Sequence, residues 1–91
     1  MKRFLIERNL PGVAALTPEQ LKEAAAKSNE ALAKLSGKVQ WVQSYVVDDK
    51  TMCVYLADDE EGVREHAHLS GLPADKITEV HGIIDPMTAI T

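Results

Sequence analysis

The stretch Leu16-Thr17-Pro18-Glu19-Gln20-Leu21 carries the densest helix-start signal in this chain of 91 residues. Thr17 suits the N-cap, Pro18 suits the first helical position, and Gln20 completes a capping box with Thr17. Beyond it, small and apolar residues recur at spacings of three and four, with charged residues on the other side. Gly37 is a typical helix end. The stretch therefore predicts a long amphipathic helix from Pro18 to the neighbourhood of Gly37.

Strand-like segments lie on both sides of this helix. Before it, residues 3–8 alternate apolar and other side chains, as a half-buried strand does. After it, residues 40–47 and 51–57 are rich in β-branched and aromatic residues and are separated by the turn-forming Asp48-Asp49-Lys50. These two segments predict a β-hairpin.

The C-terminal third is expected to contain a second helix followed by a fourth strand. Asp58 and Glu61 stand at capping-box spacing, and residues 70–73 supply a stop, so a short second helix is expected between them. Residues 77–84 alternate weakly until Asp85-Pro86 interrupts them. The resulting order, βαββαβ, predicts one α+β domain over residues 1–91 with the ferredoxin-like fold, in which both helices cover one face of a four-stranded antiparallel sheet.

Composition and charge exclude several classes of function. Ten Lys and Arg residues oppose fourteen Asp and Glu residues, and the net charge of −4 comes without a basic block, which disfavours nucleic acid and anionic membranes as partners. The apolar opening Phe4-Leu5-Ile6 is too short for a signal peptide or a membrane span, so a cytoplasmic location is expected. The single cysteine, Cys53, cannot form an internal disulfide.

Period-two alternation predicts which strand residues face the helices, if a three-residue turn, 48–50, places Val47 opposite Thr51. A two-residue turn would turn one strand over relative to the other. The residues expected to face the helices are Phe4, Ile6, Val42, Val46, Met52, Val54, Leu56, Val80 and Ile84. Those expected on the open face are Arg3, Leu5, Glu7, Trp41, Gln43, Tyr45, Cys53, Tyr55, Glu79 and His81.

An open face that holds the aromatic residues needs a cover. A second copy that packs against the sheet would supply it, because Trp and Tyr favour interface cores, so we expect a homodimer resembling the dimeric α/β-barrel assemblies. The polar groups Glu7, Gln43, Glu79 and His81 could line a pocket between the two sheets, or could bond to one another in a filled interface. Both alternatives stay open.

Imidazole, thiol and carboxylate groups could meet on this face. Glu7, Cys53 and His81 together would suit nickel, copper or zinc, although no CxxC, HxxxH or HExxH spacing is present. His66 and His68 cannot chelate one ion on a helix, because a spacing of two places them about 200° apart. His66 flanks the buried stripe of its helix and His68 faces solvent. For Cys53 and His66 a purely structural role remains an alternative.

Five blocks of the sequence resemble a family of small bacterial proteins that is usually labelled only as a domain of unknown function and includes a nickel-binding ferredoxin-like protein. The blocks are residues 7–12, 41–46, 49–50 with 53–55, 64–67 and 72–75. The resemblance spans nearly the whole chain and implies a ferredoxin-like protomer, dimerisation, and nickel binding or a role in metal response. The matched positions are Glu7, Ser44, Tyr45, Cys53, Tyr55 and His66. Gln43 departs from the pattern, since relatives often carry a histidine there.

Three functions follow as hypotheses. The first is a non-enzymatic homodimer that binds a transition metal, nickel by resemblance, with candidate ligands Glu7, Cys53, His66 and His81. The second is a cofactor-independent enzyme or ligand carrier whose pocket at the open face binds a small molecule through Glu7, Gln43, Ser44, Tyr45 and Tyr55. The third is an interaction module whose aromatic face meets another protein. No Ser-His-Asp order, phosphate loop or dinucleotide fingerprint is present, so no catalytic residue is assigned.

Overall fold

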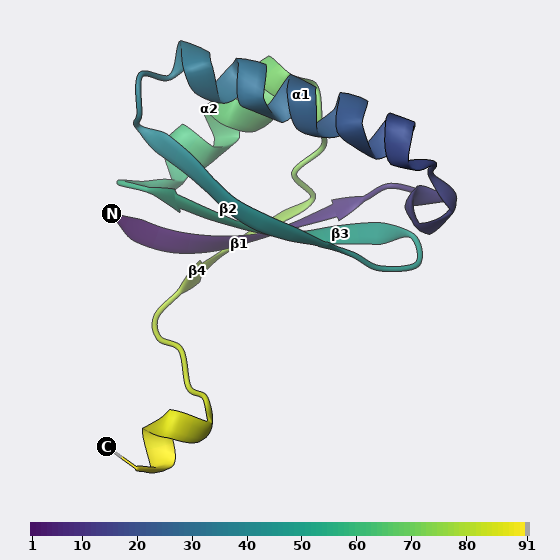
Figure 1. Ribbon diagram of the computed structural model, residues 1–91. Helices are drawn as coiled ribbons and strands as arrows, with labels where there is room; N and C mark the ends of the chain where they lie inside the picture. The colour runs from purple at the N-terminus through teal and green to yellow at the C-terminus, as the bar shows by residue number, and fades with distance from the viewer. Residues whose placement is uncertain (91) are drawn as a thin grey trace.

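A computed structural model describes residues 1–90 and has the expected element order, with two helices packed on one face of a four-stranded antiparallel sheet (Figure 1). The strands lie in the order β2-β3-β1-β4. The elements are β1 (Lys2–Asn9), the 3-10 turn η1 (Val13–Ala15), α1 (Pro18–Lys34), β2 (Val39–Val46), β3 (Lys50–Ala57), α2 (Glu60–Ser70), β4 (Lys76–Val80) and the 3-10 turn η2 (Pro86–Ala89). The α+β ferredoxin-like prediction is confirmed. Within residues 1–90, no helix is long and apolar enough to cross a membrane.

Local capping chemistry sets the helix boundaries. At the start of α1, the Gln20 amide donates to the Thr17 hydroxyl at 3.2 Å and the Thr17 amide donates to the Gln20 side chain at 2.9 Å, which is the predicted capping box. For α2 the N-cap is Asp59, which accepts from the Gly62 amide at 3.0 Å, so the expected pairing of Asp58 with Glu61 is wrong by one residue. The adjacent aspartates offer the same chemistry, and the backbone conformation selects the second.

The β2–β3 hairpin differs from the prediction in its turn. Val46 pairs with Thr51, and the Val47 amide donates to the Lys50 carbonyl at 2.9 Å, so the turn consists of two residues, Asp48 and Asp49. A change of one residue in register moves every side chain of a strand to the other face. The odd-numbered positions of β3 consequently face the helices. The predicted placement of Cys53, Tyr55, Met52, Val54 and Leu56 is therefore wrong, and the last three lie on the open face.

A β-bulge at Val42 also divides β2 into two parts of opposite alternation. Trp41 pairs with Tyr55, and Gln43 pairs with Val54, the residue next to Tyr55. Two steps along β2 thus correspond to one step along β3. Before the bulge, Trp41 lies on the helix side, contrary to expectation, and its ring stacks on Tyr55 with centroids 6.4 Å apart. After the bulge, Gln43 and Tyr45 lie on the open face, as predicted. Val42 itself is 48% exposed, so its predicted burial against the helices is also wrong.

The last strand is shorter than predicted and its faces are reversed. β4 ends at Val80, which pairs with Arg3 on the open side, while Glu79 pairs with Phe4. Ile84, which was expected to face the helices, is 86% exposed. Residues 81–90 extend away from the body on the side opposite the helices, as the yellow segment in Figure 1 shows. The alternation of residues 77–84 is too weak to show where pairing with β1 stops.

Between the sheet and the helices lies one hydrophobic core. Its buried members are Phe4, Ile6, Leu35, Val39, Cys53, Tyr55, Ala57 and Val63. β1 contributes as predicted, with Phe4 and Ile6 directed at the helices and Arg3, Leu5 and Glu7 on the other face. The core therefore occupies one face of the sheet, and the opposite face has no covering layer within residues 1–90.

Candidate functional site

The four metal ligands proposed from the sequence lie in three separate places. Glu7 is on the open face, where its carboxylate lies 3.7 Å from the Lys50 amine and 4.0 Å from the Lys76 amine. Cys53 and His66 are buried beneath the helices, and His81 follows β4 at the far end of β1 from Glu7. In residues 1–90, no three His, Cys, Asp or Glu side chains are grouped so that they could hold a metal ion.

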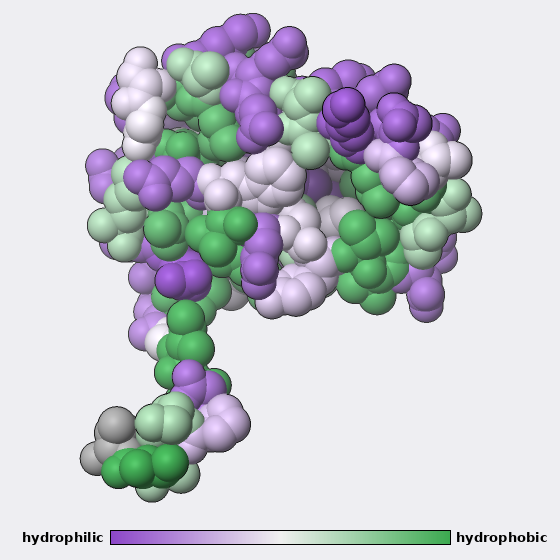
Figure 2. All heavy atoms as spheres, viewed as in Figure 1, coloured by the Kyte–Doolittle hydropathy of each residue, from purple (hydrophilic) through white to green (hydrophobic). Residues whose placement is uncertain are grey.

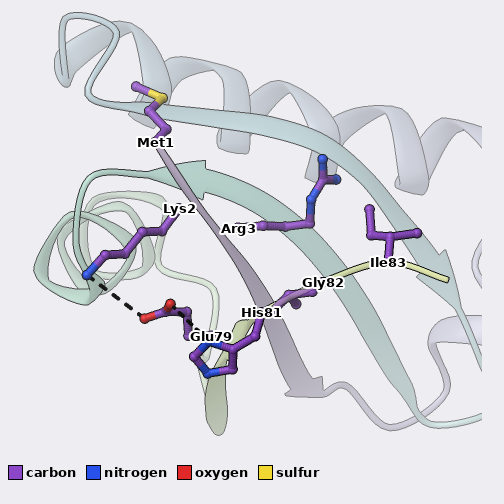
Figure 3. Close-up of a pocket in the computed structure, with 8 residues that line it drawn as sticks. Met1, Lys2, Arg3, Glu79, His81, Gly82 and Ile83 are labelled. Carbon is purple, nitrogen blue, oxygen red and sulfur yellow. Dashed lines mark ion pairs between the residues drawn. The ribbon is translucent and has the colours of Figure 1, made fainter.

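One exposed pair of metal-binding groups does exist. His81 Nδ1 lies 3.5 Å from Glu79 Oε2, and Lys2 Nζ lies 4.0 Å from the other oxygen of that carboxylate. Figure 3 shows Lys2 and His81 approaching Glu79 at the side of an open pocket of about 400 Å³, which Ile83 also lines. The His81 side chain is 84% exposed. We call Glu79 and His81 the terminal pair. It has an imidazole and a carboxylate, and within residues 1–90 no third His, Cys, Asp or Glu side chain joins them.

The residues proposed to bind a small molecule are also divided between the faces. Gln43 Nε2 donates to the Tyr45 hydroxyl at 2.6 Å on the open face. Ser44 lies on the opposite face, where its hydroxyl accepts from Trp41 Nε1 at 3.0 Å across the bulge. The predicted open-face pocket is therefore not formed by these residues together in one chain.

Tyr55 is the centre of a buried polar cluster under the helices. Its hydroxyl lies 3.3 Å from the Ser28 hydroxyl of α1 and 3.5 Å from a guanidinium nitrogen of Arg8 in β1. Its ring lies 4.8 Å, centroid to centroid, from the imidazole of His66 in α2. Burial raises the pKa of Tyr55 above its usual value, although the Ser28 and Arg8 contacts oppose the effect. The phenol therefore stays protonated.

His66 is fully buried and bonds into the same cluster. Its Nε2 lies 3.1 Å from the Ser28 hydroxyl and 3.4 Å from the Ser28 carbonyl, while Nδ1 has no hydrogen-bond partner. Burial, aided by the nearby Arg8 charge, lowers the pKa of His66, so the ring is neutral at neutral pH. Cys53 lies beside the cluster, where its thiol donates to the Thr51 hydroxyl at 3.4 Å. Tyr55 and His66 are thus in contact, although the sequence suggested Tyr55 for small-molecule binding and His66 for metal binding.

Arg8 is the residue that sequence analysis missed. It is 1% exposed, and one guanidinium nitrogen donates to the carbonyls of Leu72 and Pro73 in the loop after α2. The guanidinium also lies over the Tyr55 ring, 5.7 Å from its centroid. A signal for this was present, because Phe4, Ile6 and Arg8 alternate with period two, which places the arginine on the buried face.

Comparison with known proteins identifies the family. A family model described as nickel responsive protein SCO4226-like matches residues 4–80. The chain belongs to the SCO4226-like family. The resemblance inferred from the sequence blocks is thus confirmed, and the match to the SCO4226-like family ends just before His81.

A solved structure agrees with the fold of this SCO4226-like chain. SCO4226 from Streptomyces coelicolor A3(2) superposes with a TM-score of 0.76 at 19% sequence identity, covering 90% of this chain and 99% of the other. At this identity the likeness supports the fold alone. No match was found among curated proteins.

Proposed function

We propose that this protein is a nickel-binding homodimer that acts in a metal response, and that the terminal pair of each chain supplies half of the nickel site. The observation that carries the proposal is the exposed contact of His81 with Glu79 at 3.5 Å, to which no third His, Cys, Asp or Glu of the described residues 1–90 is added. Membership of a family described as nickel responsive supports the choice of metal.

The donor chemistry agrees with nickel. Ni(II) favours imidazole and oxygen ligands in square-planar or tetragonal arrangements, which need about four donors. One chain brings an imidazole and a carboxylate, so two chains related by a twofold axis would bring two of each. The family match stops at Val80, so family membership gives no support for His81 as a ligand. The role of His81 has to be tested on this chain itself.

The uncovered face of the sheet supports pairing with a second copy. Half-buried apolar side chains run across it from β1, β3 and β4, and Tyr45 adds a ring that is 55% exposed. The apolar members are Leu5, Met52, Val54, Leu56 and Val80. A face of this kind, with charged residues at its margins, is typical of a homodimer interface.

The C-terminal segment adds to the same argument. Residues 81–90 extend on the side of the open face, and Figure 2 shows apolar, green surface along this segment. Ile83 and Ile90 are 65% and 74% exposed, which is unfavourable for a chain that stays monomeric. A second copy that packs on the open face and along the edge strand β4, which contains Glu79 and is followed by His81, would bury this segment and bring two terminal pairs into one region.

Native mass spectrometry and light scattering on untagged protein, with nickel chloride added after removal of metal by a chelator, test the proposal. We expect a dimer that retains one nickel ion. His81→Ala should weaken nickel binding more than about tenfold, since loss of outer-shell partners alone can cost a metal site this much. His68→Ala is the matched control, because it removes another exposed histidine, on α2.

Three results would contradict the proposal. If the protein stays metal-free at all nickel concentrations, the proposed nickel binding is wrong. If it is a stable monomer, the proposed homodimer is wrong. Equal loss of nickel in the His68→Ala and His81→Ala proteins would mean that binding is general to surface histidines.

A further inference from the structure

A second place in the molecule has the properties of a ligand site. A cavity of about 260 Å³ lies between η1, α1 and the helix side of the sheet. Figure 2 shows the surface hollowed there, so the cavity is open to solvent on one side. Its walls are largely apolar and include Val13, Leu16, Leu21 and Val46. Arg8, Ser28 and Tyr55 also line it, so that an apolar enclosure contains a few converging polar groups.

Arg8 brings an unbalanced positive charge to this cavity. Throughout residues 1–90 it forms no ion pair, and its contacts are neutral: two backbone carbonyls, the Tyr55 hydroxyl and the Tyr55 ring. A buried cation with no anion beside it is costly, because neutral groups replace only part of the lost hydration. An arrangement of this kind is most favourable when an anion from outside the chain completes it.

The neighbouring groups do not supply the missing charge. Tyr55 stays a neutral phenol because burial raises its pKa. His66 stays neutral because burial lowers its pKa, and its Nδ1 has no partner. Ser28, which is 2% exposed, links these two side chains through its hydroxyl. The cavity therefore combines one cation with hydroxyl groups that can bond to an oxyanion.

We propose that this cavity binds a small organic acid that has one carboxylate and an apolar body, with the carboxylate at Arg8 and Tyr55 and the body against η1 and α1. The fork of N–H groups on arginine matches a carboxylate in geometry and charge. An apolar cavity of about 150 Å³ holds benzene, so 260 Å³ suits an aromatic ring or branched chain that carries an acid group. A single cation and apolar walls favour such an acid over a multiply charged phosphate.

The test uses phenylacetate as the probe, with its neutral isostere phenylacetamide and inorganic phosphate as comparators. Titrations of metal-free protein, followed by NMR, report on resonances near Tyr55 and Trp41. We expect phenylacetate to bind at least about tenfold more tightly than phenylacetamide, which is the ratio that one charge-assisted hydrogen bond provides. Phosphate should bind more weakly than phenylacetate. Comparable binding of the acid and the amide, or tighter binding of phosphate, would overturn the proposal.

Variants locate the binding without disturbing the polar cluster. Ala24 lines the cavity from α1, whereas Ala33 lies exposed on the same helix outside it. Ala24→Leu should fill the cavity and weaken phenylacetate binding at least about tenfold, while Ala33→Leu should leave it unchanged. Circular dichroism verifies that both variants fold. If Ala24→Leu binds as tightly as the unaltered protein, the ligand is elsewhere and the proposal fails. Because nickel is absent, the outcome does not depend on the proposed metal site.

Discussion

On the helix-covered face of the sheet, Arg8, Tyr55 and His66 are almost completely buried and bonded to neighbouring groups, whereas on the open face Glu7 and Tyr45 remain in contact with solvent. The covered face has its polar groups in a closed cluster beside a cavity. The open face has apolar side chains in a layer that only another molecule can bury. The difference agrees with the two proposals, in which one protomer forms the organic-acid site alone and two protomers form the nickel site together.

The largest expected effect is a loss of folding stability when the buried tyrosine is replaced, compared with replacement of the exposed tyrosine on the other face. Tyr55→Ala should lower the free energy of unfolding by about 3–5 kcal/mol, because a large buried ring is lost and a cavity remains. Tyr45→Ala, at a site 55% exposed, should change it by less than about 1 kcal/mol in the monomer. Urea unfolding followed by circular dichroism at low protein concentration measures both. Similar losses for the two variants would mean that the faces do not differ as described.

A charge placed on the open face sharpens the comparison. Val54 lies between Leu5 of β1 and Gln43 of β2 on this face. Val54→Lys should raise the dissociation constant of the proposed dimer more than about tenfold, since the charge would be buried without a partner. Stability of the monomer should change by less than about 1 kcal/mol. Sedimentation equilibrium is the measurement. Leu69→Lys, on α2, is the control and should leave the dimer intact.

The smallest effect is a pH dependence confined to the covered face. Burial lowers the pKa of His66 in the folded protein below the unfolded value of 6.5, so the unfolded chain binds a proton first as the pH falls. Stability should therefore be constant above that pH and decline below it, until the folded pKa is reached, by at most about 1.4 kcal/mol per pH unit. His66→Gln should reduce the slope of urea midpoints between pH 7 and 5.5. An equal reduction in His68→Gln would contradict the assignment.

Much of the covered face is predictable from local sequence. The capping box at Thr17 and Gln20 and the alternation in β1 each depend on neighbours a few residues away, and each is found as predicted. The same alternation contained Arg8, but an arginine at the end of a strand is ordinarily a solvent-exposed group. Its burial depends on the loop after α2, which is more than sixty residues distant.

The candidate sites depended on register, which local sequence specifies weakly. The segment Asp48-Asp49-Lys50 can form a turn of two or three residues, and the choice decides whether Cys53 and Tyr55 face the helices or the open side. The bulge at Val42 allows Trp41 and Tyr55 to stack under the helices while Gln43 and Tyr45 remain outside. Both features are selected by the packing of large side chains against α1 and α2, and a period-two pattern contains no information about them.

The sequence by itself determined the order of elements, the family and the absence of a metal motif, because these depend on spacing along the chain. It also placed the helix boundaries to within about two residues, since α1 has its C-cap at Leu35 where Gly37 was expected. Only the tertiary structure decided which residues share a site. It brought Tyr55 of β3 against His66 of α2, and it placed Glu7 and His81 near opposite ends of β1. It also buried Arg8 with no anionic side chain of residues 1–90 bonded to it. The physical reason is that strand pairing changes faces in steps of one residue, and packing against the helices determines the step.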